Sequence, residues 1–209
     1  MKNIEIRQIE VADLKYARTF AAKGMNLEKY TSNRFELYLY SKYVLYEELA
    51  KSTVALGAYW KDKLVGFLFA KFENEQPIFA NLKNHWFVRL GKKIIELSSK
   101  QEAANSYDTA NKEMYQAFSS NKIDGEITFF AVHPEMNGLG IGSQLLNELE
   151  RLKKDKFIYL YTDSGCNYPF YLKKGFDIFD EKQVSMGIKD KQVDLTCYLL
   201  YKKLASSKE

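Results

Sequence analysis

The stretch GEITFFAVHPEMNGLGIGSQLLNELERL, residues 125–152, contains the patterns that indicate the fold. Its first part alternates apolar and polar residues, which is typical of a strand. Three glycines follow at Gly138, Gly140 and Gly142, and leucines at helical spacing then predict an amphipathic helix over 141–154. Glycine lets backbone N–H groups approach a ligand closely, and a helix start carries unsatisfied N–H donors. A strand, a glycine-rich loop and a helix start in this order therefore predict an anion-binding site.

Regular elements are predicted along the rest of the chain as well, in the order β-α-α-β-β-insert-β-α-β-α-β-β. We expect one α/β domain, 1–209, with a helical insertion at about 74–122. The segment 35–50 is interpreted as a helix, although its many tyrosines would also suit a strand. The last two strands are expected to join around Gly187. The predicted strands cover 3–9, two runs within 53–72 around a turn at 61–63, 125–132, 156–162, 176–186 and 192–204, and the predicted helices cover 11–25, 35–50, 107–118, 141–154 and a short piece within 166–176 that ends at Gly175.

The composition excludes several classes of protein. Hydrophobic residues make up 46% of the chain, enough for a sizeable core, and the net charge of +4 is too small to indicate nucleic-acid binding. Two cysteines, Cys166 and Cys197, form no disulfide framework and favour a reducing compartment. No segment resembles a signal peptide or a membrane helix, so we expect a cytoplasmic protein that binds neither nucleic acid nor membrane. His85 and His133 lack metal-ligand spacing, so no metal is expected.

Three phosphate-binding templates compete for the glycine-rich loop. A P-loop requires Gly-Lys-Ser/Thr at its end, and this loop lacks it. The dinucleotide fingerprint, counted from Gly138, places Ser143 in its last position, and Asp163 imitates its ribose-binding acid. That fold requires the loop in an opening βαβ unit, whereas here the unit comes late and antiparallel strands are predicted to follow it.

The third template agrees with two separate segments. The strand ends in the tripeptide V-H-P, of which Val132 is the first residue. Gly140 and Gly142 occupy the two small-residue positions of a Q/R-x-x-G-x-G/A signature. Downstream, FYLKKGF at 170–176 is similar to an F-Y-x-x-x-G-F segment. In these features residues 126–176 resemble the GNAT superfamily of acetyl-CoA-dependent N-acetyltransferases.

The resemblance extends to the order of elements over most of the chain, and it implies a mixed, mostly antiparallel sheet. Two features depart from the family pattern. Asn137 stands where the family prefers Gln or Arg, and the insertion at 74–122 replaces a tight turn. The backbone donors of the loop do not depend on the side chain at position 137.

The resemblance implies that acetyl-CoA binds in an opening between strands 125–132 and 157–162. A bulge in the first strand is expected to leave backbone groups unpaired, and the pantetheine arm can pair with them like an added strand. The loop would wrap the pyrophosphate, which accounts for its glycines. The implied contacts to pantetheine and the thioester come from Phe130, Ala131 and Val132, and those to the pyrophosphate from Asn137, Gly138, Leu139, Gly140, Ile141, Gly142 and Ser143. Many relatives have an asparagine that contacts pantetheine where this chain has Ser164, and Asn167 is expected to serve in its place.

The implied reaction is direct attack of a primary amine on the thioester within a ternary complex. Such an amine is mostly protonated at neutral pH, so a base or a water relay must take its proton. Glu126 is the candidate base and Tyr171 the candidate acid for the departing thiolate. A charge at the start of a strand and a core tyrosine are the structural alternatives. Neither Cys166 nor His133 is expected to take part.

The acceptor amine, a small molecule or a peptide, cannot be named from these residues. The insertion is predicted to form a lid or wall over the acceptor pocket, or else a contact in a homodimer. A non-catalytic acyl-CoA-binding regulator with the same fold remains the alternative function. Four tyrosines of the second helix would either line an acceptor groove or pack in the core: Tyr38, Tyr40, Tyr43 and Tyr46.

Overall fold

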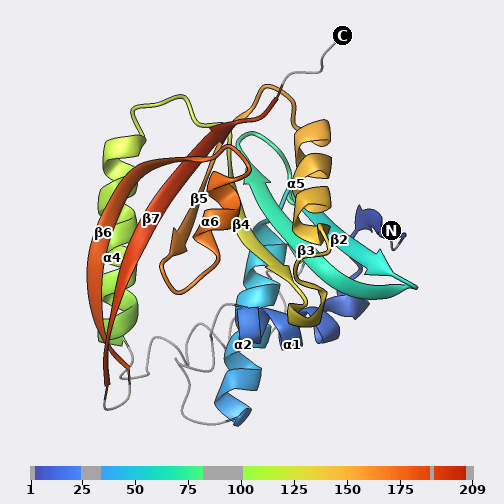
Figure 1. Ribbon diagram of the computed structural model, residues 1–209, viewed down its shortest axis with the longest axis horizontal. Coiled ribbons are helices and arrows are strands. Elements are labelled where there is room, and N and C mark those ends of the chain that lie inside the picture. Colours follow the sequence, from blue (N-terminus) through green and yellow to red (C-terminus); the bar gives the residue numbers. More distant parts are fainter. Residues whose placement is uncertain (1–2, 25–33, 82–100, 189–190, 206–209) are drawn as a thin grey trace.

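A computed structural model gives the fold of the chain (Figure 1). The structure describes residues 3–24, 34–81, 101–188 and 191–205. Its elements follow the predicted order. The helices are α1 (Leu14–Gly24), α2 (Arg34–Lys51), α4 (Gln101–Phe118), α5 (Ile141–Leu152) and α6 (Tyr168–Leu172), with 3-10 turns η1 (Val11–Asp13) and η4 (Pro134–Met136), and the strands are β1 (Glu5–Gln8), β2 (Val54–Trp60), β3 (Lys63–Phe72), β4 (Gly125–Val132), β5 (Phe157–Asp163), β6 (Asp177–Ile188) and β7 (Lys191–Lys203).

One seven-stranded sheet in the order β1-β2-β3-β4-β5-β7-β6 organises the molecule. Every neighbouring pair is antiparallel except β4 and β5, which run parallel. This confirms the mixed, mostly antiparallel sheet. It also excludes the dinucleotide-binding fold, which requires successive parallel strands joined by helices.

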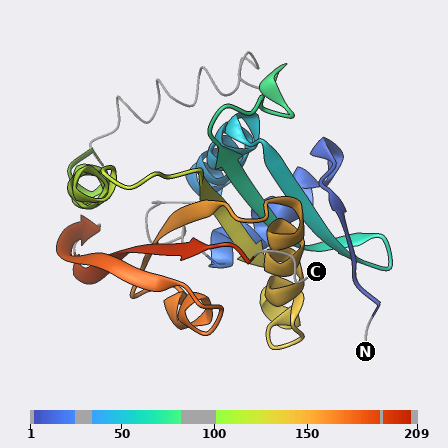
Figure 2. The same cartoon turned by 90° about the horizontal axis from the view of Figure 1, so that it is seen from above.

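Helices cover both faces of the sheet. Seen from above, α2 and α4 lie on one side and α5 and α6 on the other (Figure 2). On the α5 side, Leu145 and Leu149 enter a cluster with apolar residues of β2, β3 and β5. On the opposite side, Phe20 of α1 and Leu49 of α2 pack against rings of β3 and β4, among them Phe129. The stripes at helical spacing are therefore buried, as an amphipathic pattern requires.

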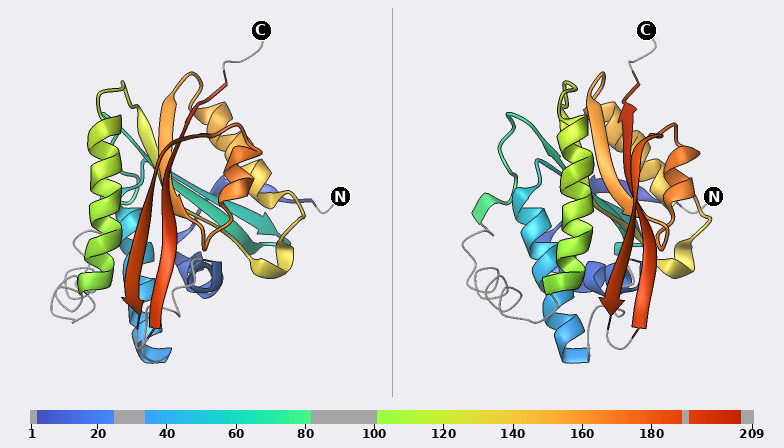
Figure 3. Two further views of the ribbon diagram at one scale, coloured as in Figure 1. Left: turned by 60° about the vertical axis from the view of Figure 1, so that its left-hand side comes forward. Right: turned by 90° about the vertical axis from the view of Figure 1, so that its left-hand side faces the viewer.

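The described part of the insertion is dominated by α4. Its residues Ala110, Met114 and Phe118 repeat at helical spacing and pack with Tyr159 and Leu199 in a third cluster over β5, β6 and β7. Figure 3 shows α4 lying along these strands, beside α2. The hydroxyl of Tyr107 donates to Asp163 Oδ2 at 3.3 Å, which ties the helix to the end of β5. The amphipathic helix predicted over 107–118 is confirmed and extends further towards the N-terminus.

Several boundaries differ from the predictions. β6 continues through Gly187, which pairs with Gln192, so the last hairpin does not turn at that glycine. α6 ends at Leu172, and the chain then passes through tight turns to Gly175, whose φ is 77°.

The segment 35–50 is helical, because Leu45 and Leu49 lie one turn apart and are both buried in the core. The middle of the insertion lies outside the described residues.

No helix in the described part of the chain is long and apolar enough to cross a membrane.

Candidate active site at the divergence of β4 and β5

The glycine-rich loop joins the end of β4 to the start of α5. Gly138 and Gly140 have φ angles of 79° and 76°. A Cβ atom at either position would meet no atom within 4 Å, so these glycines serve the left-handed backbone and not close packing. Gly140 is the N-cap of α5, and no side chain caps the helix there. The first amides of α5 therefore remain available to an anion.

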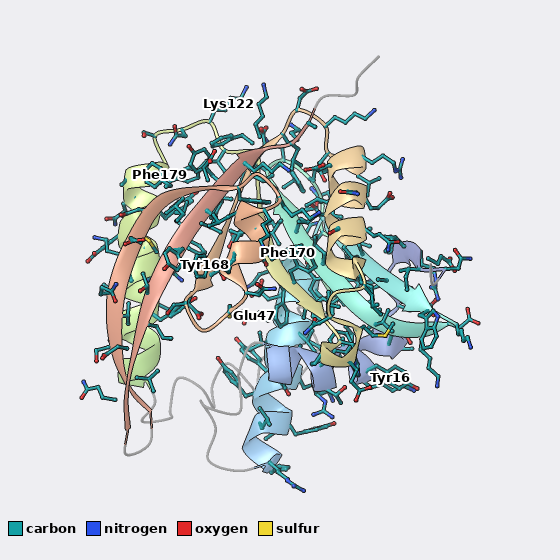
Figure 4. The ribbon with its side chains drawn as sticks, in the orientation of Figure 1. Tyr16, Glu47, Lys122, Tyr168, Phe170 and Phe179 are labelled. Carbon is teal, nitrogen blue, oxygen red and sulfur yellow. The ribbon has the colours of Figure 1, made fainter. Side chains whose placement is uncertain are left out.

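Gly142 has a different role from the other two glycines. A Cβ atom built there would lie 3.1 Å from Cζ of Phe170 and 3.5 Å from Cζ of Phe130. Phe170 lies between α6 and α5 in Figure 4. A Cβ atom here would press on the ring of Phe170, so glycine allows the first turn of α5 to pack close to this ring of α6 and to Phe130 of β4. Gly142 therefore helps the start of α5 to pack against β4, the strand that precedes the loop.

β4 and β5 are paired at one end and diverge at the other. They share only two register pairs, Gly125 with Ile158 and Glu126 with Tyr159. β4 stays paired with β3 as far as Val132, and β5 stays paired with β7 as far as Asp163. The ladder between β4 and β5 therefore ends at Glu126, and Figure 1 shows the two strands diverging beyond it. The predicted opening between these strands is present.

The predicted bulge in β4 is present as well. Phe69 pairs with Phe129 and Ala70 with Ile127, so Thr128 is an extra residue in the ladder. The extra residue moves the alternation from one face to the other. Ile127 packs in the cluster on the α5 side, whereas Phe129 packs in the cluster on the α2 side. The bulge thereby redirects the side chains of β4 at the point where the opening begins.

Tyr171 lies on the α5 side of the opening. Its ring centroid is 6.1 Å from that of Phe130 on β4, 5.3 Å from that of Phe170 and 5.6 Å from that of Phe176. Burial raises the pKa of this phenol, and the nearby Cys166 raises it further. The hydroxyl of Tyr171 therefore carries its proton at neutral pH, and burial makes it a weaker acid than an exposed phenol.

Glu126 lies where β4 and β5 are still paired. The hydroxyl of Tyr159, its register partner, donates to Glu126 Oε2 at 3.0 Å. Burial raises the pKa of Glu126, the hydrogen bond from Tyr159 opposes this, and the negative charge of Glu48 adds to it. A carboxylate with a raised pKa takes a proton more readily than an exposed one, which suits a general base.

Sequence reasoning missed both partners of Glu126. Tyr159 becomes a candidate only when the parallel register of β4 and β5 is known. Glu48 comes from α2, where it follows the buried Leu45 at helical spacing and so lies beside the sheet. Burial raises the pKa of Glu48, and Lys51, whose Nζ is 3.3 Å from it, opposes this. Two partly buried carboxylates thus lie on the α2 side near the bulge.

Several other candidates have structural contacts. His133 Nδ1 accepts from the amide of Glu135 at 3.3 Å, and its ring packs 5.7 Å from that of Phe20. Ser164 Oγ accepts from the amide of Thr196 at 3.1 Å. Asp163 accepts from the amide of Gly165 at 2.7 Å, which places it in a turn. The side chains of Asn137 and Asn167 are exposed, the first in the loop and the second at the start of α6.

The tyrosines of α2 separate into two groups. Tyr43 is buried, and Tyr46 packs against the cluster that contains Phe67, as the core-packing alternative predicts. Tyr38 is exposed, and the guanidinium of Arg18 lies 4.3 Å from its ring centroid. The four tyrosines therefore do not line one groove together. Among the described residues, no group of three or more His, Cys, Asp and Glu side chains could hold a metal ion.

The comparisons with known proteins agree with this geometry. The model of the acetyltransferase (GNAT) family matches residues 22–176. The chain belongs to this family and is therefore an acetyltransferase. A search of curated protein sequences finds no match.

Solved structures of acetyltransferases share the fold. A Corynebacterium glutamicum structure described as histone acetyltransferase HPA2 and related acetyltransferase has a TM-score of 0.60 at 13% identity, with 99% of each chain covered. The PaiA N-acetyltransferase of Thermoplasma acidophilum, in complex with coenzyme A, has a TM-score of 0.54 at 19% identity, covering 96% of this chain and 99% of that one. A Drosophila melanogaster polyamine N-acetyltransferase, which forms N-acetylagmatine, has a TM-score of 0.55 at 11% identity, covering 96% and 100%. At these identities the likeness is one of fold.

Proposed function

We propose that the chain transfers an acetyl group from acetyl-CoA directly to a primary amine within a ternary complex. The observation that carries this proposal is the divergence of β4 and β5, which lies between the glycine-rich loop and the carboxylate of Glu126. The proposal covers residues 1–209 as one domain with an insertion, and a cytoplasmic location. Binding of coenzyme A by the PaiA relative supports the choice of cofactor.

The residues present fit a coenzyme A molecule. The two left-handed glycines open the loop to a ligand, and the uncapped start of α5 offers amides for the pyrophosphate. The backbone of Phe130, Ala131 and Val132 borders the opening and would pair with pantetheine. Asn167, exposed at the start of α6, would supply a side-chain amide to the same arm. Bound acetyl-CoA supplies an acyl group activated as a thioester.

The proton transfers fall to Glu126 and Tyr171. Glu126, directly or through a water, takes a proton from the ammonium form of the acceptor. The neutral nitrogen would attack the thioester carbon, the carbon–sulfur bond would break, and Tyr171 would give its proton to the thiolate. The surplus proton of the new amide nitrogen would pass through water to the tyrosinate, which restores the phenol. Burial raises the pKa of Tyr171 and so weakens it as an acid, whereas burial of the departing thiolate would strengthen that thiolate as a base. The amide of Val132 is a candidate donor to the oxyanion.

Tyr171→Phe tests this assignment and distinguishes a catalyst from a binding-only protein. Turnover is measured as release of the CoA thiol with a panel of spermidine, agmatine and a peptide with a free N-terminus. We expect kcat to fall by about 10²-fold, the lower end for general acid catalysis, with unchanged affinity for acetyl-CoA. Tyr168→Phe, the same chemical change in the same helix, is the control and keeps its turnover. Equal turnover in Tyr171→Phe and the wild type would remove this phenol from the mechanism.

A further inference from the structure

A groove of about 480 Å³ lies between α4 and the sheet. Its floor is formed by Glu126 of β4 and by Tyr159 and Tyr161 of β5. Its wall is one stripe of α4, adjacent to the stripe that is buried in the core. Because residues three, four and seven positions apart share one helix face, the wall is continuous. The wall residues are Asp108, Asn111, Lys112, Tyr115 and Gln116.

The groove leads to the proposed base. Glu126 is part of its floor, and Tyr159, which donates to Glu126, has its ring 5.5 Å from that of Tyr115 on the wall. The hydrogen bond from Tyr107 to Asp163 fixes α4 at the other end of the groove. A molecule lying in the groove can therefore contact the carboxylate that receives the proton.

Acidic and aromatic groups surround the groove. Asp108 lies on the wall and Glu126 on the floor. Two carboxylates of α2 are near them: Glu48, whose charge raises the pKa of Glu126, and Glu47, whose charge together with that of Asp108 raises the pKa of Tyr40. The neighbouring cations are Lys112 on the wall, Lys71 near Glu126, and Lys51, whose Nζ lies 3.1 Å from Glu47 and 3.3 Å from Glu48.

The four acids exceed the three lysines, and the three tyrosine rings of the groove add π faces that attract ammonium groups. Glu126 on the floor is half-buried, so its Coulomb attraction for a cation exceeds that in bulk water, whereas Asp108 on the wall is exposed. The groove therefore favours an organic cation over a neutral or anionic ligand.

We infer that this groove is the acceptor site, and that it takes a small primary amine carrying a second positive charge, which Asp108 holds while the reacting nitrogen lies at Glu126. This inference rests on the proposed function and adds the class of acceptor. Asp108 precedes Tyr115, the wall residue near Glu126, by two helical turns, or about 10 Å along the axis. The two nitrogens of the acceptor are therefore separated by a long spacer.

Asn111 gives a second indication that the groove has a ligand. Its Oδ1 atom is buried and has no hydrogen-bond partner among the described residues. A buried acceptor without a donor costs roughly 1–3 kcal/mol, and proteins leave few such groups. After rotation of its side chain, the amide of Asn111 can accept a hydrogen bond from an ammonium group in the groove.

A matched pair of probes tests this inference: 1,8-diaminooctane, with an ammonium group at each end, and octylamine, in which one end is a methyl group. The wild type is expected to acetylate the diamine with the higher kcat/KM, because only the diamine pairs with Asp108. In Asp108→Asn we expect kcat/KM for the diamine to fall about three- to ten-fold, in line with loss of a partly exposed charge pair, through KM. The value for octylamine stays unchanged. Asp62→Asn in the distant β2–β3 turn, where asparagine tolerates the observed φ of 59°, is the control.

Binding of acetyl-CoA, followed by its effect on the melting temperature, separates the two proposals. If acetyl-CoA does not bind, the proposed function fails and this inference with it. If acetyl-CoA binds, three results overturn the inference alone: equal kcat/KM for the two probes, the same loss on both in Asp108→Asn, or turnover of the free-N-terminus peptide and of neither alkylamine. Loss of the diamine preference in Asp108→Asn, with normal binding of acetyl-CoA, supports it.

Discussion

The two faces of the sheet at β4 present different chemical groups. On the α5 side, the loop offers backbone amides and left-handed glycines, and the rings of Phe130, Phe170 and Tyr171 lie close to the start of α5. On the α4 side, the groove offers carboxylates, phenols and amides that come from side chains alone. A backbone site can serve any chain of the family, because it depends on conformation. A side-chain site belongs to the individual sequence, and here the inserted helix supplies most of it.

The largest effect is expected on the α4 side, at the base. Glu126→Gln keeps the shape and the ability to accept the hydrogen bond of Tyr159 but cannot take a proton. We expect kcat to fall by about 10²–10⁴-fold, the usual contribution of a general base. The measurement is thiol release with the amine panel. Glu73→Gln, an exposed glutamate just after β3, is the control. If Glu126→Gln stays within three-fold of the wild type, roughly the accuracy of such a comparison, a water relay without this carboxylate performs the step.

A smaller effect is expected on the α5 side, at the loop. Gly140→Val introduces a β-branched residue at a φ of 76°, which costs about 1–2 kcal/mol of backbone strain. If the strain moves the amides of α5 away from the pyrophosphate, the dissociation constant for acetyl-CoA rises by about five- to thirty-fold. Calorimetric titration measures it. Leu139→Ala, which keeps the backbone of the same loop, should bind as the wild type does. The opposite ranking of the two variants would contradict a backbone site.

The α5 side, which depends on local backbone patterns, could be predicted from the sequence better than the α4 side, which depends on side chains brought together by the fold. The glycines with Pro134 form one contiguous pattern and the 170–176 segment forms another, so local patterns were enough to place the loop and the strands beside it. Glu126 was proposed as a base from the same stretch of sequence. Its contacts with Tyr159 and Glu48 depend on strand register and on helix packing, which no local pattern contains.

The acceptor groove was predictable only in part. The repeat at Ala110, Met114 and Phe118 predicted an amphipathic helix in the insertion. It did not tell which strands that helix covers, so Asp108 and Asn111 could not be assigned to a groove. The hairpin expected around Gly187 is present, but Gly187 itself lies inside β6 and pairs with Gln192, because glycine also occurs inside strands.

The smallest effect concerns stability. Because burial raises the pKa of Glu126, the folded chain binds its proton more tightly than the unfolded chain does. Stability is therefore lost as the pH rises from the ordinary glutamate value through the raised folded value. Glu126→Gln should melt higher than the wild type at pH 7, by about 2–4 °C for each kcal/mol recovered, and equally near pH 4. Thermal unfolding at both values checks this. A variant that melts lower at pH 7 would mean that the charge stabilises the fold.

The central claim is that acetyl-CoA occupies the opening from the α5 side. The most direct test is the melting temperature of the purified chain with acetyl-CoA, CoA and NAD in parallel. A ligand at 100 times its dissociation constant adds about 2.7 kcal/mol, or roughly 5–10 °C for a chain of this length. We predict such a rise with acetyl-CoA and CoA and none with NAD. No rise with acetyl-CoA at millimolar concentration, or a rise with NAD alone, would contradict the account.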